Sequence, residues 1–165
     1  MFRLDKYMQQ WAEKYSGLKH SEQHPSFFRI NDIFALDEFL QNYINIDYPC
    51  CGIVTHLDGR LNVPKRVQNM SYECIFLVRA DETDYAAQAD AKEQAWELMW
   101  EFLIYMDQDR QKEKASGERT ALSMIDLTNL SADTLGPITN GWFQVNLKLD
   151  IQEQNKHCFN QEDYM

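Results

Sequence analysis

The chain has 165 residues, of which 44% are apolar and 13% aromatic, and its formal net charge at pH 7 is −10. This apolar content is typical of a chain that folds around one core and is too high for a disordered chain. The negative charge argues against proteins that bind phosphates through clustered lysines and arginines. We therefore expect neither a nucleic acid nor an anionic membrane as a partner.

The first residues differ from a targeting segment. Charged residues interrupt the apolar ones in Met1–Trp11, unlike in a secretory signal, and no apolar run has the length of a transmembrane helix. We therefore expect a protein that stays in the cytoplasm. Reduced thiols fit that compartment, because neighbouring cysteines on a strand point to opposite faces and rarely bridge each other. The cysteines are Cys50, Cys51, Cys74 and Cys158.

Two amphipathic helices are predicted at the start of the chain. Apolar residues recur at spacings of three and four from Phe2 to Tyr15, which is the period of a helix that buries one face. The polar stretch Leu18–Arg29 is predicted to be a loop. A second helix follows with Asn31 or Asp32 as its N-cap and ends before Pro49. Its buried side is expected to consist of Ile33, Phe34, Phe39, Leu40 and Tyr43.

The pattern then changes to that of β-structure. Cys50–Leu57 is rich in β-branched and small residues, and Asp58-Gly59 is a hairpin signal. A return strand is predicted at Arg60–Val67, where Pro64 marks an edge or a bulge because proline donates no ladder hydrogen bond. The third strand, Tyr72–Ala80, is apolar on both faces and is expected at the centre of the sheet.

The longest predicted helix follows the acidic cap candidates Asp81–Asp84 and ends near Gln111. Its buried stripe is expected to consist of Ala89, Trp96, Met99, Trp100, Leu103 and Met106. The charged segment Asp107–Arg119 is predicted to be the end of this helix and a mobile loop. A fourth strand is predicted at Ala121–Leu130, and Gly136-Pro137 marks a turn after it.

The last predicted strand, Trp142–Gln152, alternates between apolar and polar residues, which is typical of an antiparallel strand with one buried face and one wet face. The apolar face, which we expect to pack against the long helix, consists of Phe143, Val145, Leu147, Leu149 and Ile151. The wet face is expected to consist of Gln144, Asn146, Lys148, Asp150 and Gln152. Residues 155–165 show no period and are expected to be a loose tail.

This order of elements favours an α+β fold. Two helices, three strands, a long helix and two further strands are segregated along the chain, which favours a mainly antiparallel sheet over a doubly wound parallel one. We expect that sheet to be packed on one face by the long helix, with an N-terminal helical segment. A single domain is predicted over residues 1–154, followed by the tail 155–165.

The sequence lacks the common catalytic and cofactor motifs. It contains no Gly-rich phosphate loop and no His-Glu-x-x-His, Cys-x-x-Cys or Gly-x-Ser-x-Gly pattern. We therefore predict a protein that is not an enzyme, without catalytic residues, cofactor or metal. His20 and His24 have the i, i+4 spacing of a metal site on a helix, but Pro25 and the loop-like surroundings favour solvated histidines.

Two further groups have a chemical and a structural interpretation. If His56 meets Cys74 across the sheet, a base lies near a thiol nucleophile, but a buried thiol used for packing is the favoured interpretation. Glu93, Glu97 and Glu101 share one helix face. A solvated outer face is favoured there over a paired-carboxylate site.

One basic cluster contrasts with the acidic background. Arg60, Lys65 and Arg66 lie close together in the predicted hairpin, and we call them the basic cluster. Ordinary surface charge is one interpretation of it. The other is a contact with an acidic surface of a neighbouring copy.

The layout between Tyr48 and Gln152 also has a family resemblance. It combines a β-hairpin, a central strand, a long helix and a final strand, with the sequences Arg79-Ala80-Asp81, Trp96 and Trp100, and Gly141-Trp142-Phe143-x-Val145-x-Leu147. In this it resembles the tail terminator and tail-completion proteins of long-tailed bacteriophages. The resemblance implies an α+β protein that forms a ring on the end of the tail tube, stops tube polymerisation and joins the tube to the head.

The resemblance also implies partners and a location. The partners are copies of the chain itself and tail tube or head-completion proteins, with no small-molecule substrate. The location is the cytoplasm of a bacterial host, followed by incorporation into a virion. A rival interpretation is an acidic inhibitor or immunity-type protein that binds a basic enzyme, since the pI is about 4.8 and Tyr and Trp are abundant. A third, an enzyme of unfamiliar type, requires a deep pocket lined by perturbed titratable groups.

Overall fold

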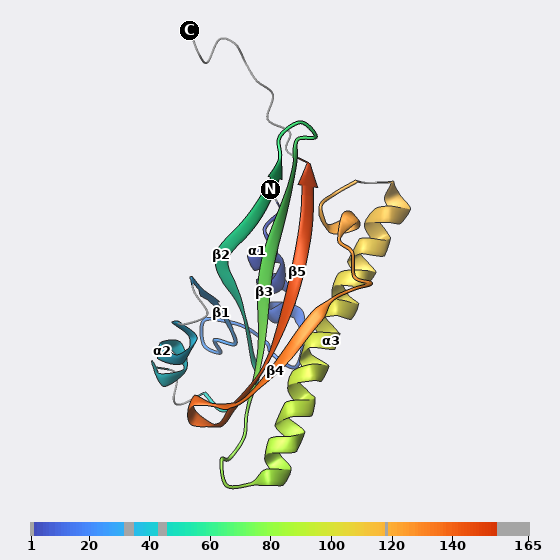
Figure 1. The fold of residues 1–165 in the computed structure, drawn as a ribbon. Helices are drawn as coiled ribbons and strands as arrows, with labels where there is room; N and C mark the ends of the chain where they lie inside the picture. Colours follow the sequence, from blue (N-terminus) through green and yellow to red (C-terminus); the bar gives the residue numbers. More distant parts are fainter. Residues whose placement is uncertain (1, 32–34, 43–45, 118, 155–165) are drawn as a thin grey trace.

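A computed structural model describes residues 2–31, 35–42, 46–117 and 119–154, and the side chains of residues 55–58 and 154 lie outside what it describes. Figure 1 shows the arrangement of the elements. The helices are α1 (Leu4–Lys14), α2 (Ala35–Asn42), α3 (Tyr85–Ser116) and the short 3-10 turns η1 (Leu122–Met124) and η2 (Thr139–Gly141). The strands are β1 (Phe27–Ile30), β2 (Cys50–Asn62), β3 (Val67–Arg79), β4 (Ser131–Ile138) and β5 (Trp142–Gln154).

The strands form one five-stranded sheet in the order β1-β2-β3-β5-β4. The central strands β3 and β5 pair antiparallel along their whole length, and β2 and β4 add to them in the same sense. The predicted α+β class and the central place of the third strand are therefore confirmed. One pair differs, because β1, which begins in the last residues of the predicted loop Leu18–Arg29, runs parallel to β2. β1 has only four residues, which is too short to show a strand period in the sequence, so its pairing with β2 identifies it as a strand.

α1 and α3 cover the same face of the sheet and enclose the larger core with it (Figure 1). The apolar face predicted for β5 lies in this core together with Met99 and Leu103 of α3, as expected. Three rings from three elements meet at its centre. The ring centroid of Trp11 lies 5.1 Å from that of Phe102 and 6.3 Å from that of Phe76, distances at which aromatic rings attract each other.

The buried stripe of α3 is partly different from the predicted one. Met99, Leu103 and Met106 are buried and Trp96 is half-buried as expected, but Trp100 and Ala89 face solvent. The additional buried positions are Ala91, Ala95, Leu98 and Phe102. The stripe is thus rotated around the helix. The prediction favoured the large Trp100, whereas Phe102 is the ring that meets Trp11 across the core.

Local contacts set both ends of α3. Asp84 caps the first turn, because its carboxylate accepts hydrogen bonds from the backbone N–H groups of Ala86 and Ala87. The helix ends at Gly117, whose φ of 78° suits glycine. It therefore extends through most of the segment predicted to be a mobile loop. Arg110 holds this last part in place, since it donates to the carbonyl oxygen of Ile125 at 2.8 Å.

The second face of the sheet is not bare, in contrast to the prediction. α2 covers part of it in a smaller core with β1 and with Ile75, Leu77 and Trp142 of the sheet. Gln144 and Asn146, predicted on the wet face, are buried on this side, where the Gln144 amide donates to the Asn146 side-chain oxygen. Lys148, Asp150 and Gln152 are exposed as expected. Of the residues predicted for the second helix, Asp32, Ile33, Phe34 and Tyr43 lie outside the described residues.

The β2–β3 hairpin turns later than predicted. Asp58 and Gly59 belong to β2 and pair with Ser71 and Met70 of β3, so the chain does not reverse at Asp58-Gly59. The turn comprises residues 63–66, with Pro64 in the turn rather than in a strand. The Asn62 side chain accepts a hydrogen bond from the backbone N–H of Lys65 at 3.1 Å, which favours a reversal at this point.

The fourth strand also differs from the prediction. The segment Ala121–Leu130 forms η1 and irregular chain, and β4 comprises Ser131–Ile138, which includes the cis peptide Gly136-Pro137. Thr120 and Ser123 form reciprocal hydrogen bonds between backbone N–H groups and hydroxyls at 3.0 and 3.1 Å. These bonds close a helical turn that buries Leu122. The apolar residue Leu122, in the segment predicted to be a strand, thus packs in the core from a helical turn.

We expect the thiols of Cys50, Cys51 and Cys74 to resist alkylation in the native protein. All three are free and buried, and Cys50 and Cys51 point into different cores as predicted. Burial raises the pKa of Cys50 to about 12 and the pKa values of Cys51 and Cys74 above their usual range, so the reactive thiolate is scarce. Peptide mapping by mass spectrometry should find them alkylated only after denaturation. Rapid native alkylation, or a disulfide among them, would contradict this burial. Cys158 lies outside the described residues.

Candidate interaction surface

The tip of the β2–β3 hairpin exposes two neighbouring aliphatic side chains. We define the hairpin tip as residues 60–66, all of which are exposed. Leu61 and Val63 have exposed fractions of 73% and 79%. In Figure 1 the tip lies at the end of the sheet opposite α2. Isolated exposed aliphatic residues are common, but two of them beside a proline on a protruding turn form a small apolar patch.

The structure brings the basic cluster together on this tip. Arg60 lies near the end of β2, where it pairs with Asn69 of β3, and Lys65 and Arg66 lie in the turn. None of the three forms an ion pair with another residue that the structure describes. The tip therefore presents positive charge and aliphatic side chains together, on a chain whose net charge is −10.

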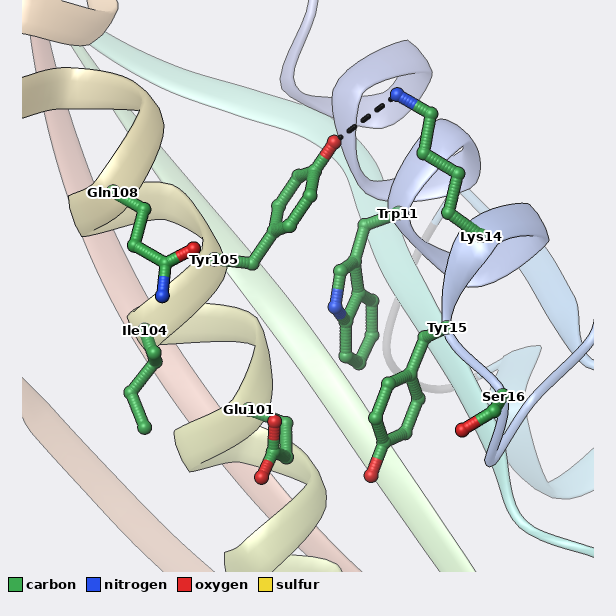
Figure 2. Close-up of a pocket in the computed structure, with 8 residues that line it drawn as sticks. All are labelled: Trp11, Lys14, Tyr15, Ser16, Glu101, Ile104, Tyr105 and Gln108. Atoms are coloured by element: carbon green, nitrogen blue, oxygen red, sulfur yellow. Dashed lines mark hydrogen bonds between the residues drawn. The ribbon is translucent and has the colours of Figure 1, made fainter. Parts of the chain in front are cut away.

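A pocket of about 340 Å³ opens between α1 and α3 (Figure 2). It is lined by Trp11, Lys14, Tyr15, Ser16, Glu101, Ile104, Tyr105 and Gln108. Trp11 is buried and stacks on Tyr15 with 5.2 Å between ring centroids. At one end, the Lys14 ammonium donates to the Tyr105 hydroxyl at 3.3 Å. We call this the α1/α3 pocket.

The α3 side of this pocket is both apolar and acidic. Ile104 lines it with an exposed fraction of 48%, and Trp100, one turn earlier, is 57% exposed. Glu97 and Glu101 lie one turn apart beside them, and both are exposed. Burial and then the negative charges of Glu101 and Glu97 raise the pKa of Tyr15, so both carboxylates act on the pocket. Exposed apolar groups beside carboxylates suit a partner that is apolar and basic.

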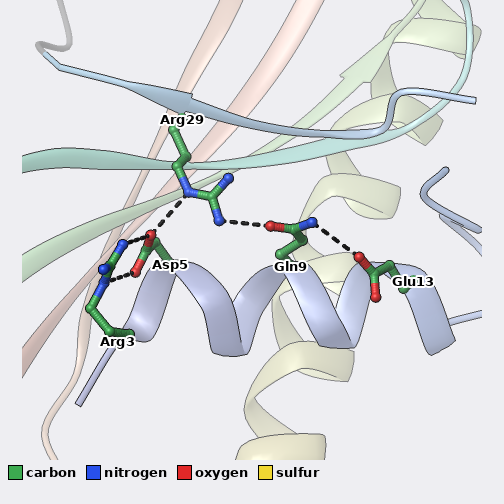
Figure 3. A network of polar contacts seen from close by, with 5 residues as sticks. All are labelled: Arg3, Asp5, Gln9, Glu13 and Arg29. Atoms are coloured by element: carbon green, nitrogen blue, oxygen red, sulfur yellow. Dashed lines mark hydrogen bonds and ion pairs between the residues drawn. The ribbon is translucent and has the colours of Figure 1, made fainter. Parts of the chain in front are cut away.

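A polar network fixes α1 against the sheet and so positions one wall of the α1/α3 pocket (Figure 3). The buried Asp5 carboxylate accepts hydrogen bonds from Arg3 at 2.8 and 2.6 Å and from Arg29 of β1 at 3.0 Å. Arg29 also donates to Gln9 at 2.7 Å, and Gln9 donates to Glu13 at 3.0 Å. The hydrogen bond from Arg3 is the main reason that the pKa of Asp5 is well below its usual range.

The two histidines considered for a metal site have other contacts. The Nδ1 atom of His20 accepts hydrogen bonds from the backbone N–H groups of Ser26 and Phe27, each at 3.1 Å. His24 stacks on Tyr48 with 3.8 Å between ring centroids. Both lie in irregular chain rather than on one helix face. Cys74 is buried, and the side chain of His56 lies outside what the structure describes.

Sequence reasoning found the basic cluster and missed the α1/α3 pocket. The pocket joins helices from opposite parts of the chain, so no local pattern encodes it. The available signal was the pair Trp100 and Ile104, whose spacing places two apolar side chains on one helix face. The glutamates of α3 that were expected on a solvated face are exposed, and Glu101 also lines the pocket.

No family model matches the chain, and no curated protein matches it. The longest described helix, α3, contains many charged residues. Within the described ranges, no helix combines the length and the apolar character needed to cross a membrane.

Proposed function

We propose that this protein acts without catalysis, by assembling with copies of itself into a ring of the tail terminator type that caps a phage tail tube and joins it to the head. The observation that carries the proposal is the hairpin tip, where Leu61 and Val63 are exposed beside three cations. When a second protein surface covers aliphatic side chains on a protruding, positively charged turn, their apolar area is removed from water, which favours association.

The edges of the sheet support the same proposal. Among the described strands, β1 pairs only with Cys51–Val54 of β2, and β4 pairs only with β5. On the side away from β3, residues 55–62 of β2 thus carry no neighbouring strand that the structure describes, and neither does the side of β4 away from β5. An open strand edge is a site where a strand of another chain can pair. When two different surfaces of the chain meet, a rotation relates each copy to the next. The copies form a closed ring if that rotation divides a full turn evenly.

The test is to reverse the basic cluster with Arg60→Glu, Lys65→Glu and Arg66→Glu. We expect the fold and its melting temperature to change little, because all three side chains are exposed. Self-association in sedimentation velocity should be lost, and so should capping of tail tubes, which electron microscopy would reveal as overlong or headless tails. Exposed pairs contribute only about 0.2–1 kcal/mol each, so all three are reversed together.

The control is a reversal of three other exposed lysines, Lys6→Glu, Lys19→Glu and Lys92→Glu. It changes the net charge by the same amount and should leave assembly intact. Normal assembly by the variant with the reversed basic cluster would exclude the hairpin tip as the contact. A wild-type protein that neither self-associates nor caps a tube would reject the proposed function.

A second candidate is an acidic inhibitor of a basic enzyme, and one observation favours it. Trp100 is more than half exposed next to Glu97 and Glu101, and tryptophan is enriched among the residues that dominate binding energy at interfaces. A stable one-to-one complex with a basic protein, without self-association, would support this candidate over the ring.

A further inference from the structure

We propose that the hairpin tip of one copy docks into the α1/α3 pocket of the next copy, so that this pocket is the receptor surface of the assembly. The inference rests on the self-assembly proposed above and names the two surfaces that meet. One is the tip, with its aliphatic and cationic side chains. The other is the pocket with its neighbours Glu97 and Trp100 on α3.

The two surfaces match in charge. The tip carries Arg60, Lys65 and Arg66. The α3 side of the pocket carries Glu101, and the exposed Glu97 lies one turn before it on the same helix. The cation of the pocket, Lys14, lies at one end and is held by the Tyr105 hydroxyl. The positive charges of a docked tip would therefore lie along α3, away from Lys14. Opposite charges of this kind fix the orientation of partners and speed their encounter.

They also match in apolar character and in size. Leu61 and Val63 on the tip, and Trp100 and Ile104 on α3, are among the most exposed large apolar side chains of the described chain. Docking would remove all four from water at once. The pocket volume of about 340 Å³ is at the small end of the range for binding pockets, roughly 300–1,000 Å³. Such a volume suits a few side chains of a turn rather than a whole helix.

The tip of one copy does not reach its own pocket. α1 starts beside the hairpin, where the Phe2 backbone N–H donates to Glu153, and then runs away from the tip. Its Trp11 packs on Phe76, nine residues along β3 from Val67, which is about 30 Å at 3.3 Å per residue. The tip is held in a paired hairpin, so the contact must join two copies through different surfaces.

The experiment combines two variants in sedimentation velocity. One has the reversed basic cluster, and the other carries Glu97→Lys and Glu101→Lys. Each alone should self-associate at least tenfold more weakly than the wild type. A one-to-one mixture should associate again, because the negative tip of the first variant meets the positive pocket of the second. The unchanged, positive tip of the second variant also meets the unchanged, negative pocket of the first. Glu22→Lys with Glu38→Lys is the matched control, since both side chains are exposed outside the pocket.

The outcomes separate this inference from the proposed function. Recovery in the mixture supports the contact between tip and pocket. Normal association of the pocket variant, or loss that the mixture does not recover, overturns the inference while a wild-type ring still supports the function. A wild type that does not self-associate overturns both.

Discussion

Replacing Phe102 with alanine is expected to lower the free energy of unfolding by about 3–5 kcal/mol. The side chain is fully buried on α3 and packs against Trp11 of α1 and Phe76 of β3. Truncation would remove these ring contacts and leave a cavity between three elements, which the surrounding side chains fill only in part. Urea unfolding followed by circular dichroism measures the loss.

Tyr85→Ala is the matched control for this variant. Tyr85 is also an aromatic residue of α3 and is almost fully exposed, so its truncation should change the free energy of unfolding by less than about 0.5 kcal/mol. A loss below about 1 kcal/mol for Phe102→Ala would show that α3 does not pack on the sheet through this face. Leu147→Ala on β5, a residue already expected in the core from its alternation, should cost about 2–5 kcal/mol.

Asp5→Asn is expected to lower the free energy of unfolding by about 1.5–3 kcal/mol at pH 7, since it weakens hydrogen bonds between charged groups. The Asp5 carboxylate joins Arg3 and Arg29 in a mostly buried position, and an amide of the same shape keeps the packing but loses the charge. Urea unfolding at a series of pH values measures the difference between wild type and variant.

The pH dependence of this difference has a defined sign. The pKa of Asp5 is lowered in the folded protein, mainly by its hydrogen bond with Arg3. Its contribution is therefore fully present above the unfolded-state pKa of about 3.9 and is lost as the pH falls below that value. Asp133→Asn, which changes an exposed carboxylate on β4, should show no such trend. An Asp5→Asn difference that is the same at pH 3 and pH 7 would contradict the ion-pair role.

The parts of the fold that follow from the sequence are those with a local signal. The three- and four-residue spacing located α1, the acidic cap located the start of α3 at Asp84, and the alternation of β5 identified its core face. Other features depend on partners far along the chain. Asp58-Gly59 reads as a turn by itself, yet pairing with Ser71 and Met70 keeps it in a strand. Gln144 and Asn146 are buried on the α2 side of the sheet, where the Gln144 amide donates to the Asn146 side-chain oxygen.

The candidate surface was likewise only partly predictable from the sequence. The basic cluster was visible because its three residues lie close together in sequence. Which face of α3 is buried depends on Trp11 of α1, and the sequence alone did not show that Phe102 rather than Trp100 meets it. The α1/α3 pocket is formed by that same pairing of helices, so it became visible only with the fold.

The pairing of β3 with β5 at the centre of the sheet determines when this chain can fold during synthesis. α3 lies between the two strands in sequence, so the sheet lacks its middle until Trp142–Gln154 has left the ribosome. α1 is made first but has only 11 residues, fewer than the roughly 12–15 at which an isolated helix becomes even marginally stable in water. Its stability therefore depends on packing against the sheet that includes Glu153, which accepts a hydrogen bond from the N–H of Phe2, two residues before the helix. Contacts of such long sequence separation make folding slow, and a nascent chain that ends before β5 would expose its apolar strands to aggregation.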